Sequence, residues 1–334
     1  MKIGILGAGS WGTTLAELLH TNGHSVTLWS WSERDVENIR ITGRNTVYLP
    51  DIAIPEGLSV TADLAEAATA KDMIVISTPS QFVRGVLTSI SQETIGDPVI
   101  VNVAKGIENG TLLRMSEVVH NVMPQLSPQR YAVLSGPSHA EEVCKRRPTS
   151  VVAASASKDT TALVIETFMT DSFRVYGSRD VPGVELGGSL KNVIAIGAGI
   201  CDGSHFGDNT KAALITRGIA EIQRLGEVLG AEAQTFAGLS GLGDLIVTTM
   251  SRHSRNRYVG EEIGKGRPVK EVLAGMTMVA EGVDTTRSAY GLAKKHNVEM
   301  PIVREMFEIL FNGKDPVQAT QDLMMREAKN EVWS

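Results

Sequence analysis

Cysteine is scarce in this chain, which contains only Cys144 and Cys201 among its 334 residues. The two lie far apart and form no Cys-x-x-Cys pair, so we expect neither a disulfide framework nor a zinc site. His20 and His24 are close in sequence, but the helix-ending pair at 22–23 separates them and no third ligand is in view, so no metal is predicted. The composition is typical of a protein of the reducing cytoplasm.

The chain also lacks an excess of positive charge and long uncharged apolar runs. Its formal net charge is −6, which argues against a general nucleic-acid-binding surface. No window approaches the roughly 18 uncharged apolar residues of a membrane-spanning helix. The apolar start at 1–6 runs into a glycine-rich turn and not into a cleavage site, so it is interpreted as a strand and not as a signal peptide.

Short apolar runs rich in Val and Ile alternate with helix-like or turn-rich segments through the first half of the chain. This alternation predicts an α/β domain with a doubly wound parallel sheet covered by helices on both faces. The predicted strands are 2–6, 25–29, 73–77, 99–103, 131–134, 150–154 and 173–176.

The segment 7–12, Gly-Ala-Gly-Ser-Trp-Gly, matches the G-x-G-x-x-G pattern at the point where the first strand turns into a helix. Gly7 permits the tight turn, Gly9 lets the backbone approach a pyrophosphate, and Gly12 allows the helix to pack closely on the strand. The unpaired N–H groups of the helix start then face the anion. The alternative is a glycine turn kept only for packing.

The second strand bears on the choice of dinucleotide. An NAD-specific site usually places an acid at its tip, whereas this chain has Trp31 and Ser32 there, followed by Glu33 and Arg34. Arg34 is suited to a 2′-phosphate, which favours NADP(H) with NAD(H) tolerated. The open alternative is that Arg34 is a solvated residue at a helix start.

Ligands of doubly wound sheets bind outside the carboxyl ends of the strands. The residues to inspect there are 78–80, 104–106 and 135–140. Lys105 stands out because it is a lone cation at the end of an apolar strand, suited to a phosphate or to a carbonyl oxygen near the nicotinamide. The alternative is an ordinary surface lysine.

The polar, breaker-containing stretch 178–183 marks the predicted domain boundary, which gives a dinucleotide-binding domain at 1–182 and a helical domain at 183–334. Strand signals fade beyond it. Helices are predicted at 186–198, 209–229, 280–295, 303–311 and 316–330. Met276, Met278, Met300 and Met306 are interpreted as core filler.

The first of these helices is apolar or small almost all the way round, except for Lys191 and Asn192. A buried ammonium must be paired, face a wet cleft or have a lowered pKa. Moving a lysine pKa to between 7 and 8 takes about 4 kcal/mol, which desolvation and a second cation such as Lys105 can supply. Lys191 is therefore a candidate general base, the alternative being an ion pair with Glu185.

A second polar group lies at 244–257. Asp244 follows a glycine-dense run, where it can orient the lysine or bind a hydroxyl, or else cap a helix. Ser254, Arg255 and Asn256 offer a guanidinium and an amide for a phosphate. The alternative for the latter group is a solvated basic turn.

The whole chain resembles the bacterial-type NAD(P)-dependent glycerol-3-phosphate dehydrogenases. The resemblance covers an ordered series of motifs: Gly-Ala-Gly-Ser-Trp-Gly-Thr at 7–13, the segment 45–50 ending Tyr-Leu-Pro, Ala-Lys-Gly at 104–106, Ser-Gly-Pro-Ser at 135–138, the segment 186–199 containing Lys-Asn-Val-Ile-Ala, Gly-Leu-Gly-Asp at 241–244, Ser-Arg-Asn-Arg at 254–257 and Glu-Gly at 281–282. It implies a Rossmann-type domain followed by an all-helical domain like that of 6-phosphogluconate dehydrogenases, with the site in the cleft between them.

The resemblance also implies residue roles. Lys191 is the proton acceptor, and Lys105, Asp244, Asn192 and Thr248 support the reacting end. Besides the glycines, the dinucleotide contacts implied are Ser10, Trp11, Lys105, Ala140, Arg255, Val279 and Glu281. Trp31, Arg34 and Tyr48 are added as further candidate contacts of the cofactor. The substrate contacts implied are Lys105, Gly136, Ser138, Lys191, Asp244, Ser254, Arg255 and Asn256. Many relatives carry a basic residue where this chain has Trp31, so Trp31 is expected to stack on adenine instead.

The reaction implied is the reversible transfer of hydride between sn-glycerol 3-phosphate and dihydroxyacetone phosphate, supplying glycerol 3-phosphate for phospholipid synthesis in the cytoplasm, by a homodimer. Two other hypotheses stay open. A 3-hydroxy acid or phosphogluconate dehydrogenase shares the two halves and a lysine base but needs a carboxylate clamp. A dinucleotide-sensing regulator keeps the glycine turn but has no reason to bury Lys191 beside Asn192.

Overall fold

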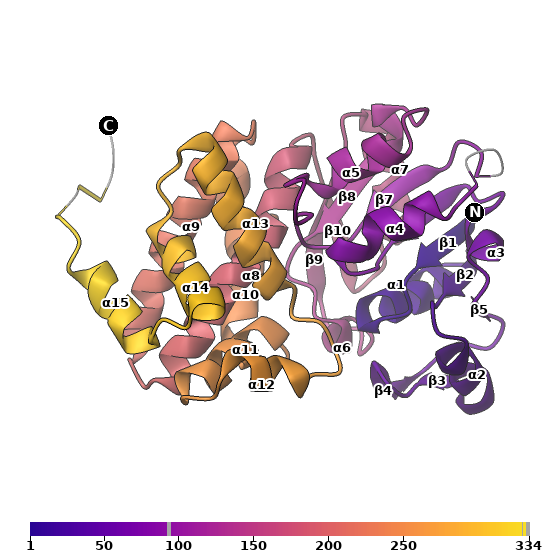
Figure 1. Cartoon of the computed structure of the whole chain (residues 1–334). Coiled ribbons are helices and arrows are strands. Elements are labelled where there is room, and N and C mark those ends of the chain that lie inside the picture. Colours follow the sequence, from indigo (N-terminus) through magenta and orange to yellow (C-terminus); the bar gives the residue numbers. More distant parts are fainter. Residues whose placement is uncertain (92–94, 329, 332–334) are drawn as a thin grey trace.

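The computed structural model describes residues 1–91, 95–328 and 330–331. It has two halves, a β-sheet with helices on both faces and a bundle of helices (Figure 1). Helix α8 (Val181–Gly203) starts almost directly after the last strand, β10 (Phe173–Ser178). The boundary we propose at 182/183 therefore falls in the first turn of α8.

The main sheet has eight strands in the order β10-β9-β8-β7-β6-β1-β2-β5. All seven strands predicted from the sequence are present, and β5 is an additional edge strand. The bounds before β10 are β1 (Lys2–Leu6), β2 (Ser25–Trp29), β5 (Ser59–Thr61), β6 (Met73–Ile76), β7 (Val99–Asn102), β8 (Tyr131–Ser135) and β9 (Thr149–Ala154). A separate ribbon of β3 (Arg44–Asn45) and β4 (Leu49–Ala53) is also absent from the prediction.

The sheet is parallel as predicted, except at one pairing. Neighbouring strands in the part of the sheet ordered β5-β2-β1-β6-β7-β8 pair in parallel. Strand β9, however, runs antiparallel to β8, and β10 is parallel to β9. Between β8 and β9 lies only the four-residue helix α6 (Ala140–Val143). So short a helix does not span a strand's length, as the crossover to a parallel neighbour requires. The carboxyl ends of β1, β6, β7 and β8 still share one edge.

Alternate residues of the central strands enter different cores, as the pleat of a strand requires. In β6, Met73 and Val75 pack in one cluster with Leu15 of α1 (Ser10–Thr21). Ile74 and Ile76 pack in another cluster with Val118 of α5 (Met115–Val122). The sheet is therefore covered on both faces, as predicted. The covering helices are α1 (Ser10–Thr21), α2 (Glu33–Thr42), α3 (Leu64–Ala68), α4 (Val83–Thr88), α5 (Met115–Val122) and α7 (Lys158–Phe168), with short 3-10 turns η1 (Ser80–Phe82) and η2 (Pro128–Arg130).

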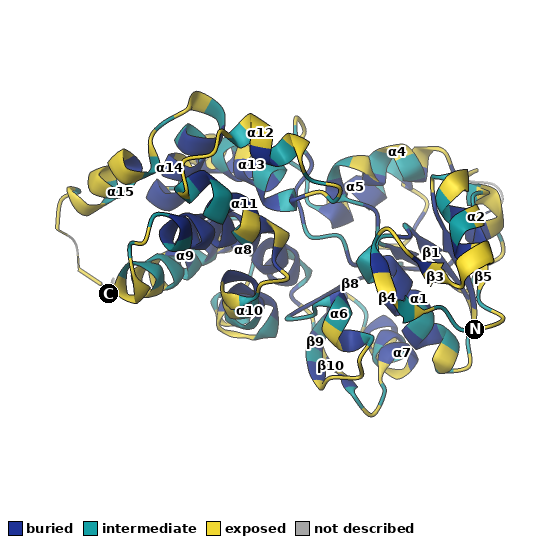
Figure 2. Ribbon diagram, turned by 90° about the horizontal axis from the view of Figure 1, so that it is seen from below, coloured by how far each residue is buried: buried dark blue, intermediate teal, exposed yellow. Residues whose placement is uncertain are grey.

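The second half is helical, as predicted, and its core forms around α8, which is dark blue along its length in Figure 2. After α8 come α9 (Asp208–Val228), η3 (Ala233–Ala237), η4 (Leu239–Gly243), α10 (Asp244–Met250), α11 (Arg255–Gly264), α12 (Val269–Ala274), α13 (Glu281–His296), α14 (Pro301–Asn312) and α15 (Pro316–Met324). Helix α15 ends six residues before the predicted end at 330, and residue 329 lies outside the described residues.

In the described part of the chain, α8 is long and apolar enough to cross a membrane by length and composition, but its apolar window is entirely buried inside the protein. Such a helix is typical of a protein core. Both described cysteines are free thiols, and no group of three or more potential metal-ligating side chains occurs among residues 1–91, 95–328 and 330–331.

Candidate active site

The glycine turn after β1 has the geometry that its sequence predicts. Gly7 has φ +124°, and a Cβ on Gly12 would lie 1.8 Å from the carbonyl oxygen of Gly7, so neither position accepts a side chain. A Cβ on Gly9, by contrast, would meet no atom within 4 Å. Gly9 is the N-cap of the twelve-residue α1. The turn thus leaves open space beside the N–H groups at the start of α1, which fits a dinucleotide pyrophosphate.

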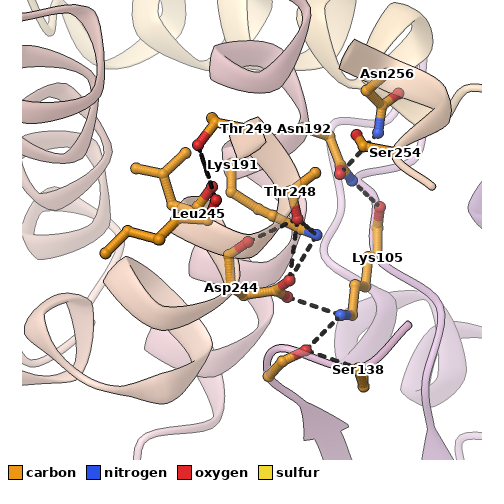
Figure 3. Close-up of polar contacts among 12 residues, drawn as sticks. Lys105, Ser138, Lys191, Asn192, Asp244, Leu245, Thr248, Thr249, Ser254 and Asn256 are labelled. Carbon is orange, nitrogen blue, oxygen red and sulfur yellow. Dashed lines mark hydrogen bonds and ion pairs between the residues drawn. The ribbon is translucent and has the colours of Figure 1, made fainter. Parts of the chain in front are cut away.

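Two lysines and one aspartate form the centre of the site (Figure 3). Lys191 Nζ donates to Asp244 Oδ1 at 2.7 Å and to Thr248 Oγ1 at 2.6 Å. Lys105 Nζ donates to the other oxygen, Asp244 Oδ2, at 2.7 Å and to the Gly136 carbonyl at 2.9 Å. The side chains of Lys191 and Asp244 are only 7% and 2% exposed. An ammonium has three N–H donors, so Lys191 keeps one beyond these two bonds.

The charges of this cluster set its protonation. Burial lowers the pKa of Lys191, the carboxylate of Asp244 opposes that shift, and the charge of Lys105 adds to it, which leaves the pKa at about 8. Burial alone raises the pKa of Asp244, but the charges and hydrogen bonds of Lys105 and Lys191 outweigh it and hold the pKa below its ordinary value. Asp244 is therefore ionised at neutral pH while Lys191 can exchange a proton.

Glycines on α8 bring these elements together. A Cβ on Gly187 would lie 2.7 Å from the Ser240 carbonyl oxygen, and a Cβ on Gly188 would lie 2.5 Å from Ser135 Oγ and 3.7 Å from Lys105 Cγ. Helix α8 thus packs directly on the end of β8, beside Lys105 after β7, and on the π-helical turn η4, which runs into α10. Such π-turns are frequent at functional sites. Here the turn places Asp244 next to Lys191.

A chain of amides links the helical half to the loop of Lys105. Asn192 Nδ2 donates to the Lys105 carbonyl oxygen at 3.3 Å, and Asn256 Nδ2 donates to Asn192 Oδ1 at 2.9 Å. Asn256 Oδ1 in turn accepts from Gly282 N at 2.9 Å. Asn256 therefore has one N–H left to donate to a substrate phosphate, because its other N–H is engaged within the protein.

The remaining predicted residues lie around this centre. Ser138 Oγ donates to the Gly136 carbonyl oxygen, Ser254 caps α11 by accepting from Arg257 N, and Glu281 Oε1 accepts from Ser80 N at 2.9 Å. Ala140 begins α6. Burial raises the pKa of Glu281 to about 7. Arg255 is exposed and close enough for its charge to act on Glu281.

The residues predicted to meet the outer part of the dinucleotide lie at the surface. Trp31 is 78% exposed and Val279 41% exposed. Arg34 is exposed in the first turn of α2, and Tyr48 is half-buried just before β4. The geometry fits both interpretations of Arg34, because the solvated start of α2 follows the carboxyl end of β2 within a few residues.

Two alternatives drawn from the sequence are wrong. Lys191 does not pair with Glu185, because the Glu185 carboxylate is bound by Arg114, Ser116 and Tyr131. Asp244 does not cap α10, because it is the first residue of that helix and its side chain binds the two lysines.

Two residues near the site, Met278 and His139, were not predicted from the sequence. Met278, interpreted as core filler, is half-buried, and the Ser10 hydroxyl in the glycine turn points at its sulfur at 4.0 Å. His139 has a buried, unpartnered Nε2, and burial together with the charges of Lys191 and Lys105 lowers its pKa. The spacing of the methionines gives no signal that Met278 lies at the glycine turn. For His139, the only signal in the sequence is its position in the segment 135–140 after a predicted strand.

The fold and the site together define an NAD(P)-dependent oxidoreductase. Residues 2–161 and 180–321 match the family models described as the N-terminus and the C-terminus of NAD-dependent glycerol-3-phosphate dehydrogenase. The chain belongs to this family.

Relatives support the same assignment over the full length. The chain is 51% identical over 332 residues, covering 99% of it and 100% of the relative, to a Syntrophotalea carbinolica protein named glycerol-3-phosphate dehydrogenase [NAD(P)+]. The crystal structure of glycerol-3-phosphate dehydrogenase from Coxiella burnetii superposes with a TM-score of 0.93 at 40% identity, over 97% of this chain and 99% of that one. A putative 2-dehydropantoate 2-reductase from Enterococcus faecalis shares the fold, with a TM-score of 0.55 at 16% identity, covering 98% of this chain and 100% of that one.

Proposed function

We propose that this protein interconverts sn-glycerol 3-phosphate and dihydroxyacetone phosphate with NADP(H) or NAD(H). The observation that carries the proposal is the buried cluster in which Asp244 holds both Lys191 and Lys105 at 2.7 Å at the edge of the sheet where the glycine turn opens. A lysine with a pKa of about 8 suits a reaction that moves one proton on and off an alcohol.

The side chains divide the chemistry between them. When bound, the nicotinamide accepts or supplies the hydride. In the oxidation direction, Lys191 Nζ in its neutral form takes the proton of the C2 hydroxyl, while Asp244 and Thr248 hold the amine in place. The Lys105 ammonium polarises the oxygen that becomes a carbonyl. In the reduction direction, Lys191 is the acid that protonates this oxygen.

The assay for this proposal follows the loss of reduced cofactor at 340 nm with dihydroxyacetone phosphate. We expect turnover with NADPH and slower turnover with NADH. A panel of 3-hydroxy acids and phosphogluconate tests the two rival dehydrogenase activities. Turnover of one of these substrates, with no turnover of dihydroxyacetone phosphate, would overturn the proposal. Cofactor binding without turnover of any substrate would instead favour a dinucleotide sensor.

Arg255 is the proposed anchor of the substrate phosphate. It is exposed in the first turn of α11 and accompanied there by the cap Ser254. Arg255→Ala should raise the KM for dihydroxyacetone phosphate at least tenfold at fixed cofactor and change kcat much less, because the bond to the phosphate is remote from the reacting carbon. Arg252→Ala, which removes an exposed arginine from the preceding turn, is the control. An unchanged KM in the Arg255 variant would reject the phosphate role.

Arg34 is the proposed contact for the 2′-phosphate of NADP(H). Arg34→Ala should raise the KM for NADPH about tenfold and leave that for NADH unchanged, because only the former carries the extra phosphate. NADH is thus the control within the same enzyme. Equal effects on both cofactors would assign Arg34 to a solvated helix start.

The cellular setting is also part of the proposal. We infer a cytoplasmic enzyme that supplies glycerol 3-phosphate for phospholipid synthesis and acts as a homodimer. Free thiols at Cys144 and Cys201 support a reducing compartment. The subunit number is tested by light scattering of the purified chain, in which a monomer mass would reject the dimer.

A further inference from the structure

Glu185 carries a buried negative charge that the proposed reaction does not use. It lies in the second turn of α8, and its side chain is 4% exposed. Four hydrogen bonds reach its two oxygens: from Ser116 N at 2.7 Å, Ser116 Oγ at 2.7 Å, Tyr131 Oη at 2.6 Å and Arg114 Nη1 at 2.9 Å. Burial and the charge of Glu185 raise the pKa of Tyr131 well above its ordinary value, so its hydroxyl stays protonated and donates.

All of these donors belong to the sheet half of the molecule. Tyr131 begins β8, and Ser116 lies in α5 with Arg114 as its N-cap. The other end of the link is α8, which belongs to the helical half. A buried carboxylate with all its oxygens engaged fixes the geometry of the groups around it. Glu185 therefore ties α8 to the cofactor-binding half.

The N-cap of the same helix is tied to the helical half. Asp180 caps α8 by accepting from Gly183 N at 2.8 Å, and its other oxygen accepts from Glu232 N at 2.9 Å and from Thr235 Oγ1 at 2.6 Å. The beginning of α8 is thus held from both halves by two carboxylates. A displacement of this helix start would break bonds on one side or the other.

The position of this link matters because α8 also carries Lys191. The rise of an α-helix is about 1.5 Å per residue, so Lys191 lies about 9 Å further along the same rigid helix. Between the two residues, α8 packs closely on Ser240 at Gly187 and on Ser135 at Gly188. A shift at Glu185 would therefore move the amine relative to Lys105 and to the glycine turn.

We propose that Glu185 is a positioning residue, which sets the placement of Lys191 against the nicotinamide by bonding α8 to the sheet half. This inference rests on the proposed function. It predicts that loss of the link slows hydride transfer, since small errors in the placement of reacting groups cost rate more than binding.

Glu185→Gln tests the inference, because the amide keeps the shape but can no longer accept all four bonds. We expect kcat for dihydroxyacetone phosphate to fall about tenfold, with its KM within twofold of the wild type. With NADPH deuterated at the transferred position, the isotope effect on kcat should increase as hydride transfer becomes slower than the other steps. A role in stability alone would lower the melting temperature and leave the isotope effect unchanged.

Glu117→Gln is the matched control. Glu117 pairs with the same Arg114 at 3.2 Å, but it lies on α5 in the sheet half and its side chain is 44% exposed. This variant should keep the wild-type kcat and isotope effect. Tyr131→Phe is a milder second variant, which removes one donor and no charge and should lower kcat about threefold with a raised isotope effect.

The possible outcomes are distinct. A folded Glu185→Gln protein with the wild-type kcat and isotope effect would overturn the inference, and Tyr131→Phe decides in the same way if Glu185→Gln does not fold. A wild type that does not reduce dihydroxyacetone phosphate would instead refute the proposed function. The same comparison is then made with the hydroxy acid that the enzyme does use.

Discussion

Replacement of Lys191 by alanine is expected to lower kcat at least a hundredfold while the affinity for NADPH stays within about twofold. General acid–base groups contribute about 10²–10⁴-fold to rate, and Lys191 is the amine bound by both Asp244 and Thr248. The glycine turn that holds the dinucleotide is untouched. Steady-state rates at 340 nm and fluorescence titration with NADPH measure the two quantities.

Lys211→Ala is the control for this variant. Lys211 lies in the same half and its Nζ binds both oxygens of Asp202 at 2.9 Å, but that pair lies outside the site. Its loss should leave kcat unchanged. A Lys191→Ala enzyme with turnover near that of the wild type would contradict the assignment of the base.

The pH dependence of the wild type reports the same group. The neutral amine is the base, so kcat/KM for oxidation of glycerol 3-phosphate should rise as the pH increases through about 8, the pKa of Lys191. The reduction direction needs the ammonium and should decline over the same range. The Lys191→Ala variant should show neither the rise of kcat/KM in oxidation nor the decline in reduction.

Replacement of Asp244 by asparagine is expected to lower kcat about a hundredfold. The carboxylate holds two cations at 2.7 Å in a buried position, and loss of one partner of a buried pair costs up to about 3–5 kcal/mol. Since the charge of Asp244 raises the pKa of Lys191, its removal should move the rising limb of the oxidation profile to lower pH. The profile of kcat/KM and the melting temperature measure both effects.

Asp202→Asn provides a matched comparison. Asp202 also sits between two cations, Lys211 and Arg257, with 25% of its side chain exposed, and it takes no part in the proposed chemistry. It should keep the wild-type pH profile. If kcat/KM for oxidation by the Asp244→Asn enzyme rises at the same pH as in the wild type, Asp244 does not control the pKa of Lys191.

Much of the fold could be predicted because its central elements are strongly patterned. The strands with runs of Val and Ile are buried on both faces, which makes them apolar without interruption. Short elements gave no such signal: β5 has three residues, and β3 has two. The reversal of β9 depends on the length of α6, which sequence periodicity does not fix.

The residues at the centre of the candidate site could be singled out from the sequence, but their contacts could not. Lys191 stood out as a cation in an apolar helix, and Lys105 as a cation at a strand end. That one aspartate joins both depends on three elements far apart in the sequence and on close packing at Gly187 and Gly188. The partners of Glu185 come from two further segments, so the sequence suggested a pair with Lys191 that the structure does not have.

The most direct test of the account is a crystal structure of the ternary complex with NADPH and glycerol 3-phosphate, a combination that cannot react. We predict that Lys191 Nζ lies within hydrogen-bonding reach, about 2.6–3.2 Å, of the C2 hydroxyl oxygen, with the nicotinamide C4 facing the same carbon. An amine bonded only to Asp244 and Thr248, with the C2 oxygen beyond its reach, would contradict the central claim.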